Sequence, residues 1–210
     1  ALRGPPEYCL EIILSESPQS IAGSEWDGRY ATARTAHKPT VLDPRRQPMC
    51  TSIRFADKSG NLYLARNLDW NTRYGEQVVY TPEGYELGLS FADNAPARYN
   101  VLGMAVAAGN YPLYFDCGND AGLAVAGLNH PGNTVYTPEP VEGKMNIAAY
   151  EFPLWIAARF ATVEEARAAL ADVNIVAKPF APGQFVSKLH WIIGDATGSI
   201  VVEQLEDGLH

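Results

Sequence analysis

The fold of this 210-residue chain is decided by one stretch: Cys50-Thr51-Ser52-Ile53-Arg54-Phe55-Ala56-Asp57-Lys58-Ser59-Gly60-Asn61-Leu62-Tyr63-Leu64-Ala65-Arg66-Asn67-Leu68. Two short runs with alternating apolar residues flank a group of turn-forming residues, which predicts a β-hairpin over 51–68. Cys50 directly follows Met49, so it becomes the first residue if the preceding segment is absent. A cysteine in that position can use its thiol as nucleophile and its own free amine as base.

Two registers are open for this hairpin. A two-residue loop would place Cys50 opposite Asp69, whereas a loop one residue longer would place Cys50 opposite Leu68 and Arg66 opposite Ser52. Side chains directly opposite one another in an antiparallel pair lie about 4.5–5.5 Å apart at Cβ. Either register therefore brings a cation and a carboxylate within a few residues of the Cys50 thiol.

These residue types suit amide hydrolysis. Cys50 is the candidate nucleophile, and Arg66 can supply the cation that stabilises a thiolate. Asp69 can hold the α-amino group of an N-terminal Cys50, so that the amine moves the proton between thiol and leaving group. Asn129, after an apolar run, can donate to the oxyanion of the tetrahedral intermediate. Taken singly, each residue also fits a structural role as a buried thiol, a surface ion pair or a turn residue.

Composition excludes several other classes of function. The 24 acidic and 16 basic residues give a net charge of −8, so nucleic acid is not an expected partner. Three cysteines favour a reducing compartment, and no apolar run approaches the roughly 20 residues of a membrane span; the expected location is cytoplasmic. His130 and His190 have no i, i+4 histidine partner, so a zinc site is not expected.

The chain divides into two unequal parts. Residues 1–49 hold six of the 15 prolines and show no sustained hydrophobic period. We expect this part to be a disordered leader, a propeptide or a spurious upstream segment read in frame before Met49. Residues 50–210 are expected to form the N-terminal part of one α+β domain.

Within that domain, the pattern predicts strands before and after a helical middle. A capping box, Thr162-Val163-Glu164-Glu165, predicts a helix to about Leu170. A second helix is expected over 146–160, with Pro153 as a kink. The expected strands are 51–55, 62–68, 78–80, 102–107, 113–115, 123–127, 189–193 and 199–204.

Several motifs together resemble the choloylglycine hydrolases, the bile salt hydrolases and penicillin V acylases of the N-terminal-nucleophile superfamily. The resemblance runs over 49–210 and is carried by Met49-Cys50-Thr51-Ser52-Ile53-Arg54-Phe55, Leu64-Ala65-Arg66-Asn67-Leu68-Asp69-Trp70, Tyr114-Phe115-Asp116-Cys117-Gly118-Asn119, Ala126-Gly127-Leu128-Asn129-His130-Pro131-Gly132, Glu151-Phe152-Pro153-Leu154-Trp155 and Leu189-His190-Trp191-Ile192-Ile193-Gly194-Asp195.

The resemblance implies an αββα four-layer sandwich, a bacterial cytoplasmic enzyme without cofactor, and a homotetramer. It matches Cys50 to the nucleophile, Arg66 and Asp69 to its neighbours, and Asn129 to an oxyanion-hole residue. Asn129 favours the bile salt branch, because penicillin V acylases often carry tyrosine there. The substrate pocket would be bordered by Leu68, Trp70, Phe180 and Phe185.

The chain departs from the family pattern in two ways. A free amine at Cys50 requires that residues 1–49 be removed, and a second oxyanion asparagine and another active-site arginine have no counterpart before His210. We therefore expect the sandwich to be incomplete at the C-terminus and the 210-residue chain to be inactive by itself.

The sequence thus favours an amidase that cleaves the glycine or taurine amide of conjugated bile acids through a Cys50 thioester. One alternative keeps this machinery but acts on penicillin V or an N-acyl homoserine lactone. An alternative of another class is an inactive fragment that serves only as a packing or oligomerisation module.

Overall fold

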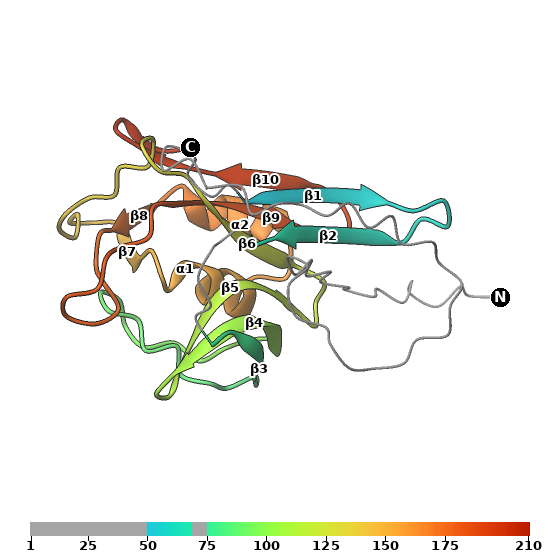
Figure 1. The fold of residues 1–210 in the computed structure, drawn as a ribbon, viewed down its shortest axis with the longest axis horizontal. Helices are drawn as coiled ribbons and strands as arrows, with labels where there is room; N and C mark the ends of the chain where they lie inside the picture. Colours follow the sequence, from blue (N-terminus) through green and yellow to red (C-terminus); the bar gives the residue numbers. More distant parts are fainter. Residues whose placement is uncertain (1–49, 69–74) are drawn as a thin grey trace, which may run out of the picture.

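A six-stranded antiparallel sheet forms the centre of the molecule, which we describe from a computed structural model over residues 50–68 and 75–210 (Figure 1). Its strand order is β10-β9-β6-β5-β4-β3, and every neighbouring pair is antiparallel. The strands of this sheet are β3 (Gln77–Thr81), β4 (Val101–Ala108), β5 (Tyr111–Asn119), β6 (Ala124–Asn129), β9 (Leu189–Gly194) and β10 (Ser199–Val202).

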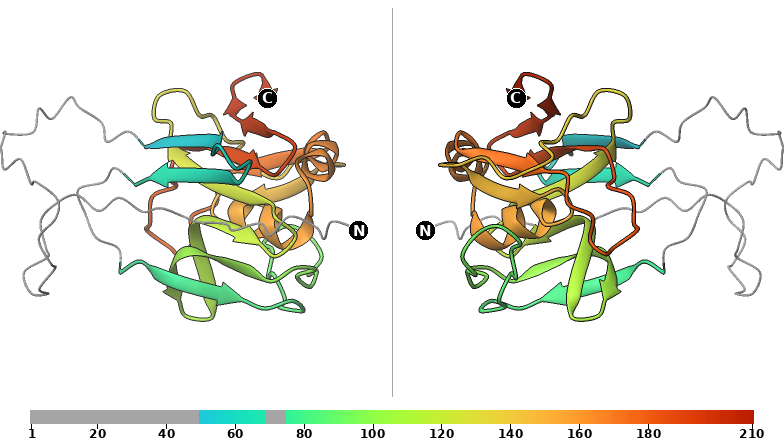
Figure 2. Two further views of the ribbon diagram at one scale, coloured as in Figure 1. Left: turned by 90° about the vertical axis from the view of Figure 1, so that its right-hand side faces the viewer. Right: turned by 90° about the vertical axis from the view of Figure 1, so that its left-hand side faces the viewer.

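Three two-stranded pairs complete the β-structure. The hairpin of β1 (Thr51–Ala56) and β2 (Leu62–Asn67) lies over the β6–β9–β10 part of the central sheet (Figure 2). A parallel pair joins β7 (Met145–Ala148) to β8 (Val173–Val176), and β11 (Gln204–Leu205) pairs with β12 (Gly208–Leu209).

The hydrophobic alternation of β6 explains why two layers pack on its two faces. Val125, together with Leu123 just before the strand, belongs to the large core beneath helix α1, whereas Ala124 and Ala126 form a small cluster with Leu64 of the hairpin. Successive side chains of a strand point to opposite faces. Small alanines on one face therefore let the hairpin approach closely, and larger residues on the other fill the helix side.

Helix α1 (Phe152–Arg159) is short and almost wholly buried against β5 and β6. The expectation of a helix over 146–160 was wrong in its first part, because Met145–Ala148 is strand β7. Pro153 does not kink the helix; it lies in the first turn, where a missing N–H costs nothing. Pro153 thus marks the helix start.

Helix α2 (Val163–Leu170) confirms the predicted capping box. The Thr162 side chain accepts a hydrogen bond from the backbone N–H of Glu165 at 3.1 Å. The Glu165 carboxylate accepts one from the Ala161 backbone N–H at 2.9 Å. Together these bonds fix the helix start, as the sequence predicts.

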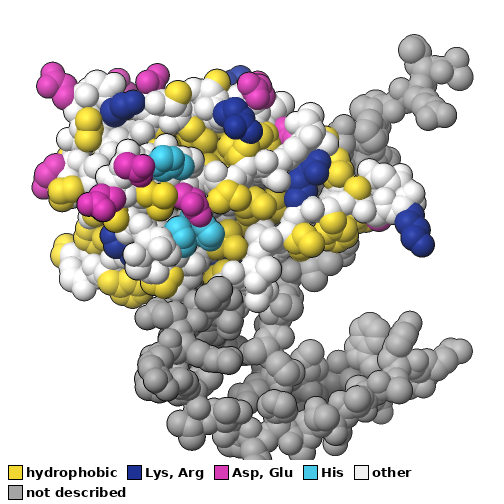
Figure 3. Space-filling view, turned by 90° about the horizontal axis from the view of Figure 1, so that it is seen from above, with side chains coloured by type: hydrophobic (Ala, Val, Ile, Leu, Met, Phe, Trp, Pro, Cys, Tyr) yellow, Lys and Arg dark blue, Asp and Glu magenta, His cyan; other side chains and the backbone are white. Residues whose placement is uncertain are grey.

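The fold matches the predicted α+β class, with a helical layer, a central sheet and a hairpin on the opposite face (Figures 1 and 2). Seen from the side of β1 and β10, the surface mixes charged, histidine and hydrophobic side chains (Figure 3). In the described part of the chain, neither helix has the length and apolar character needed to cross a bilayer.

Candidate active site

The hairpin brings the predicted thiol and guanidinium together. Ser52 pairs with Arg66 and Thr51 with Asn67, which is the register of the longer loop. Gly60 adopts a positive φ of 84° and closes the three-residue loop between Asp57 and Asn61, a conformation that glycine adopts readily. The Nη2 atom of Arg66 consequently lies 3.7 Å from Sγ of Cys50, which is half-buried.

Arg66 is held in place from two directions. Its side chain is only 4% exposed, and its Nη1 forms an ion pair with Oδ2 of Asp116 at 3.2 Å. Its Nη2 also donates to the backbone carbonyl of Gly127 at 2.9 Å. Because Leu64 and Arg66 are two residues apart on β2, both face the central sheet, and the site lies between the hairpin and that sheet.

Asp116 was not among the predicted site residues, although it lies within one of the quoted motifs. Burial raises the pKa of the Asp116 carboxyl, and the Arg66 charge opposes this shift without cancelling it. Both charged groups of the ion pair thus lose their hydration on burial. At this depth either charge would be strongly unfavourable without the other. A carboxylate in the middle of an otherwise apolar strand was the signal that could have identified Asp116.

The other predicted residues fall in different places. Asn129 is the last residue of β6, two positions after the Gly127 carbonyl that accepts from Arg66, and it is half-buried. Leu68 is half-buried just after β2. Asp69 and Trp70 lie outside the described residues.

The two phenylalanines predicted to border the substrate pocket have different surroundings. The Phe180 ring packs against the rings of Tyr111 and Tyr150, with centroid distances of 5.8 and 5.3 Å. Phe185 is 70% exposed. The structure therefore places Phe180 in an aromatic cluster and Phe185 on the surface.

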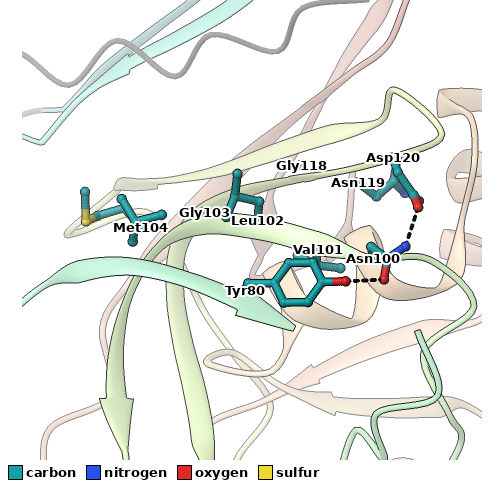
Figure 4. A pocket seen from close by; sticks show the side chains of 10 residues that line it. Tyr80, Asn100, Val101, Leu102, Gly103, Met104, Gly118, Asn119 and Asp120 are labelled. Carbon is teal, nitrogen blue, oxygen red and sulfur yellow. Dashed lines mark hydrogen bonds between the residues drawn. The ribbon is translucent and has the colours of Figure 1, made fainter. Parts of the chain in front are cut away.

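A hollow of about 450 Å³ lies on β3, β4 and β5 (Figure 4). Its lining includes the exposed side chains of Val78, Tyr80 and Leu102, and also Met104, which lies directly across from Asp116. The hollow is therefore on the same face of the sheet as the hairpin. In a four-layer sandwich this face packs on a second sheet, of which the described residues supply β1 and β2. We accordingly interpret the hollow as interlayer space.

Comparison with known proteins identifies the class of protein first. The fold is that of the N-terminal-nucleophile hydrolases: a crystal structure of a cysteine-to-alanine variant of the conjugated bile acid hydrolase from Clostridium perfringens matches with a TM-score of 0.72 and 36% identity, over 77% of this chain and 50% of that one. Penicillin V acylase from Agrobacterium tumefaciens shares the fold with a TM-score of 0.60 at 23% identity, over 76% of this chain and 48% of that one.

The family follows from the sequence. Residues 50–210 match the linear amide C–N hydrolases, choloylglycine hydrolase family, and the chain belongs to that family. It is 50% identical over 163 residues to the bile salt hydrolase/transferase of Bifidobacterium longum subsp. longum, covering 77% of this chain and 51% of that protein. It is 44% identical over 155 residues to the conjugated bile acid hydrolase of Lactobacillus acidophilus, covering 74% and 49%. The chain spans about half the length of the curated relatives it matches.

Proposed function

We propose that this chain carries the nucleophile of an amidase that cleaves the amide bond between a bile acid and glycine or taurine. The observation that carries the proposal is the 3.7 Å contact between Cys50 Sγ and the buried Arg66 guanidinium. The substrate is suggested by the bile salt and conjugated bile acid hydrolases at 50% and 44% identity.

The proposed reaction uses a free α-amine at Cys50, so the active form begins at that residue. The amine accepts the thiol proton while the sulfur attacks the amide carbonyl carbon. The C–N bond then breaks, glycine or taurine leaves with that proton, and the bile acyl group stays on Cys50 as a thioester. One water molecule then attacks the thioester carbon, the C–S bond breaks, and the free bile acid leaves as the Cys50 thiol is regenerated.

Arg66 contributes a fixed positive charge next to the attacking sulfur. Its bonds to Asp116 and to the Gly127 carbonyl restrict its position, and a preorganised charge stabilises a developing anion without having to reorient. Asp69 would orient the α-amine, and Asn129 would donate to the oxyanion. The Asp116 carboxylate therefore has a positional role in the proposed reaction: it holds Arg66 against Cys50.

The whole protein would act in the cytoplasm on a small-molecule substrate and would assemble as a homo-oligomer, with a tetramer implied by the family. Leu68, Trp70, Phe180 and Phe185 remain the candidates for contact with the steroid. An apolar lining suits that ligand.

The test uses protein purified from its natural host. Intact mass and N-terminal sequencing should give a chain that begins at Cys50, and the protein should release taurine from taurocholate. Cys50→Ala should reduce turnover by about 10⁴-fold or more, because the nucleophile is lost. Acid quenching of the unmodified enzyme should trap the bile acyl group on the Cys50 peptide.

The matched control is Cys117→Ala, which removes the other described thiol and should retain turnover. Equal turnover of Cys50→Ala and the unmodified protein would refute the catalytic assignment and favour a packing module. Faster cleavage of penicillin V than of taurocholate would retain Cys50 as the nucleophile but replace the proposed substrate.

A further inference from the structure

A second cluster of reactive side chains lies outside the Cys50 site. His190 Nδ1 is 2.9 Å from Oε1 of Glu203, and His130 Nε2 is 3.9 Å from the same oxygen. The two imidazole rings are stacked with centroids 4.4 Å apart and an interplanar angle of 14°. One atom from each of the three side chains lies within 4.8 Å of the others.

The strand order of the central sheet creates this cluster. His190 is in β9, directly across from Leu128, while His130 follows β6 and donates its backbone N–H to the Lys188 carbonyl at 2.8 Å. Glu203 follows β10, the other neighbour of β9, and its backbone exchanges two hydrogen bonds with His210. The i, i+4 argument from the sequence covers only helices, whereas here neighbouring strands bring the ligands together.

The hydrogen bonds of Thr134 orient one of the two imidazoles. Its Oγ1 donates to the Leu189 carbonyl at 3.1 Å and lies 3.2 Å from His130 Nδ1. A carbonyl cannot donate, so both contacts are satisfied together only when His130 Nδ1 carries the proton. In neutral His130 the Nε2 lone pair then faces the Glu203 carboxylate, and two acceptors face one another with no proton between them.

A positive charge between these groups removes that conflict, either as a proton on His130 Nε2 or as a metal ion. We infer that His130, His190 and Glu203 bind a divalent transition metal of the zinc type, with a water molecule as a further ligand. Two imidazoles and one carboxylate form a ligand set that zinc adopts in open sites. A hydrogen-bond acceptor behind a metal-binding imidazole is a common supporting contact, and the Thr134 hydroxyl supplies one here. The three side chains are 19%, 23% and 32% exposed, so a metal ion can reach them from solvent.

Binding requires one imidazole to rotate out of the stack, because nearly parallel rings direct their nitrogen lone pairs along separate lines. Both histidine side chains are partly exposed, which leaves room for that rotation. Tetrahedral zinc with ligands at about 2.0–2.1 Å separates its ligand atoms by roughly 3.3 Å. The 2.9 Å and 3.9 Å separations lie on either side of that value. Figure 3 shows histidine and acidic side chains next to one another on this face. The net charge of −8 also favours a cation over an anion at this surface.

The experiment titrates Zn²⁺ into the full chain by calorimetry, with Cys9 and Cys50 replaced by serine so that thiols do not compete. One zinc ion should bind per chain. His190→Gln and Glu203→Gln should each weaken binding by about 100-fold or more, and Thr134→Val by roughly 10-fold. His210→Gln is the matched control, because this histidine pairs with Asp207 outside the cluster, and its affinity should be unchanged.

A second readout uses Co²⁺ absorption, which should show ligand-field bands that disappear in His130→Gln. Circular dichroism in EDTA should show that each variant is folded. Absence of zinc binding by the parent protein would overturn the inference. So would an equal loss of affinity in His210→Gln and His190→Gln. Because no catalytic turnover is measured, failure here leaves the proposal for Cys50 untouched.

Discussion

The two faces of the central sheet differ most clearly at two consecutive residues of β5. Asp116 points toward the hairpin and pairs with Arg66, whereas Cys117 points toward helix α1 and lies 3.5 Å from the Pro153 carbonyl. Burial, followed by the nearby Asp116 charge, raises the pKa of the Cys117 thiol well above its ordinary value. Cys117 is thus kept neutral, while Cys50 lies against a cation.

The difference shows how one sheet separates chemistry from packing. The helix face is filled by large apolar side chains, among them Trp191 and Phe152, whose ring centroids are 4.3 Å apart. The hairpin face carries small residues together with the buried Arg66–Asp116 pair. Of the strands of the central sheet, β5 therefore directs its buried charge toward the face where the proposed reaction takes place, whereas the buried Glu151 carboxylate belongs to the N-cap of α1.

Replacing the charged residue of the hairpin face should have the largest effect on stability. Asp116→Asn leaves the buried Arg66 without its counter-charge, and breaking such a pair typically costs about 3–5 kcal/mol. We expect urea denaturation to show this loss of unfolding free energy. Alkylation of Cys50 by iodoacetamide, followed by peptide mapping, should also slow as Arg66 moves away from the sulfur.

A double variant separates the two contributions. Arg66→Met with Asp116→Leu replaces the pair by apolar residues of similar volume and should recover most of the lost stability. Recovery of stability without recovery of Cys50 reactivity would show that the reactivity depends on the Arg66 charge rather than on the stability of the fold. If the single Asp116→Asn variant is as stable as the unmodified protein, the buried Arg66 does not need the Asp116 counter-charge, and this interpretation of the hairpin face is wrong.

The helix face should respond to volume rather than charge. Gly103 lies across from Cys117, and a Cβ built at Gly103 would be 2.1 Å from the Asp116 carbonyl oxygen and 2.5 Å from Cys117 Cβ. Gly103→Ala must push β4 and β5 apart, which we expect to cost about 1–3 kcal/mol. Thermal unfolding measures this cost.

Gly198→Ala is the matched control for that measurement. A Cβ at Gly198 would meet no atom within 4 Å, so its effect should stay within about 0.5 kcal/mol. Equal destabilisation by the two substitutions would show that the strands at Gly103 can relax, and that the helix face is less tightly packed than described.

The smallest effect on stability is expected at the β9–β10 turn, which contacts both the hairpin and helix α2. Partial burial raises the pKa of Asp195, but hydrogen bonds from the backbone N–H groups of Val163, Thr197 and Gly198, and from the Thr197 hydroxyl, outweigh it and lower the pKa below 3.8. The ionised form is therefore favoured in the folded state. It adds stability above pH 3.8, and this is lost as the pH falls through the lowered value.

Asp195→Asn should consequently lower stability by roughly 0.5–1 kcal/mol at neutral pH, the usual effect of a carboxylate near a helix N-terminus. The melting temperatures of the two proteins should converge as the pH is lowered through and below 3.8. A difference that grows toward low pH would have the wrong sign and would exclude this role for Asp195.

Local signals in the sequence were sufficient for most elements of the fold. The Thr162 capping box predicted α2, and turn residues around Ser59-Gly60 and 195–198 predicted both hairpins with strands close to those observed. The hairpin register was left open between two loops because a one-residue difference is not encoded in residue type alone. The observed pairing of Ser52 with Arg66 resolves it.

Long-range contacts could not be predicted in the same way. Asp116 and Arg66 are 50 residues apart, and only the pairing of β5 with β6 and the docking of the hairpin bring them together. The strand β7 was missed because no glycine or proline separates Ile147 and Ala148 from the start of α1 at Phe152, so periodicity could not separate strand from helix.

Arg54 of the hairpin donates to the backbone carbonyls of Asp195 and Ala196 at 3.0 and 2.9 Å, contacts that span 141 and 142 residues. During translation the hairpin is synthesised well before the β9–β10 turn. The hairpin therefore cannot dock on this turn until the turn has also been synthesised. Closing such a long loop is entropically costly and slow. During synthesis, the hairpin therefore cannot complete its docking until the last strands of the sheet have formed.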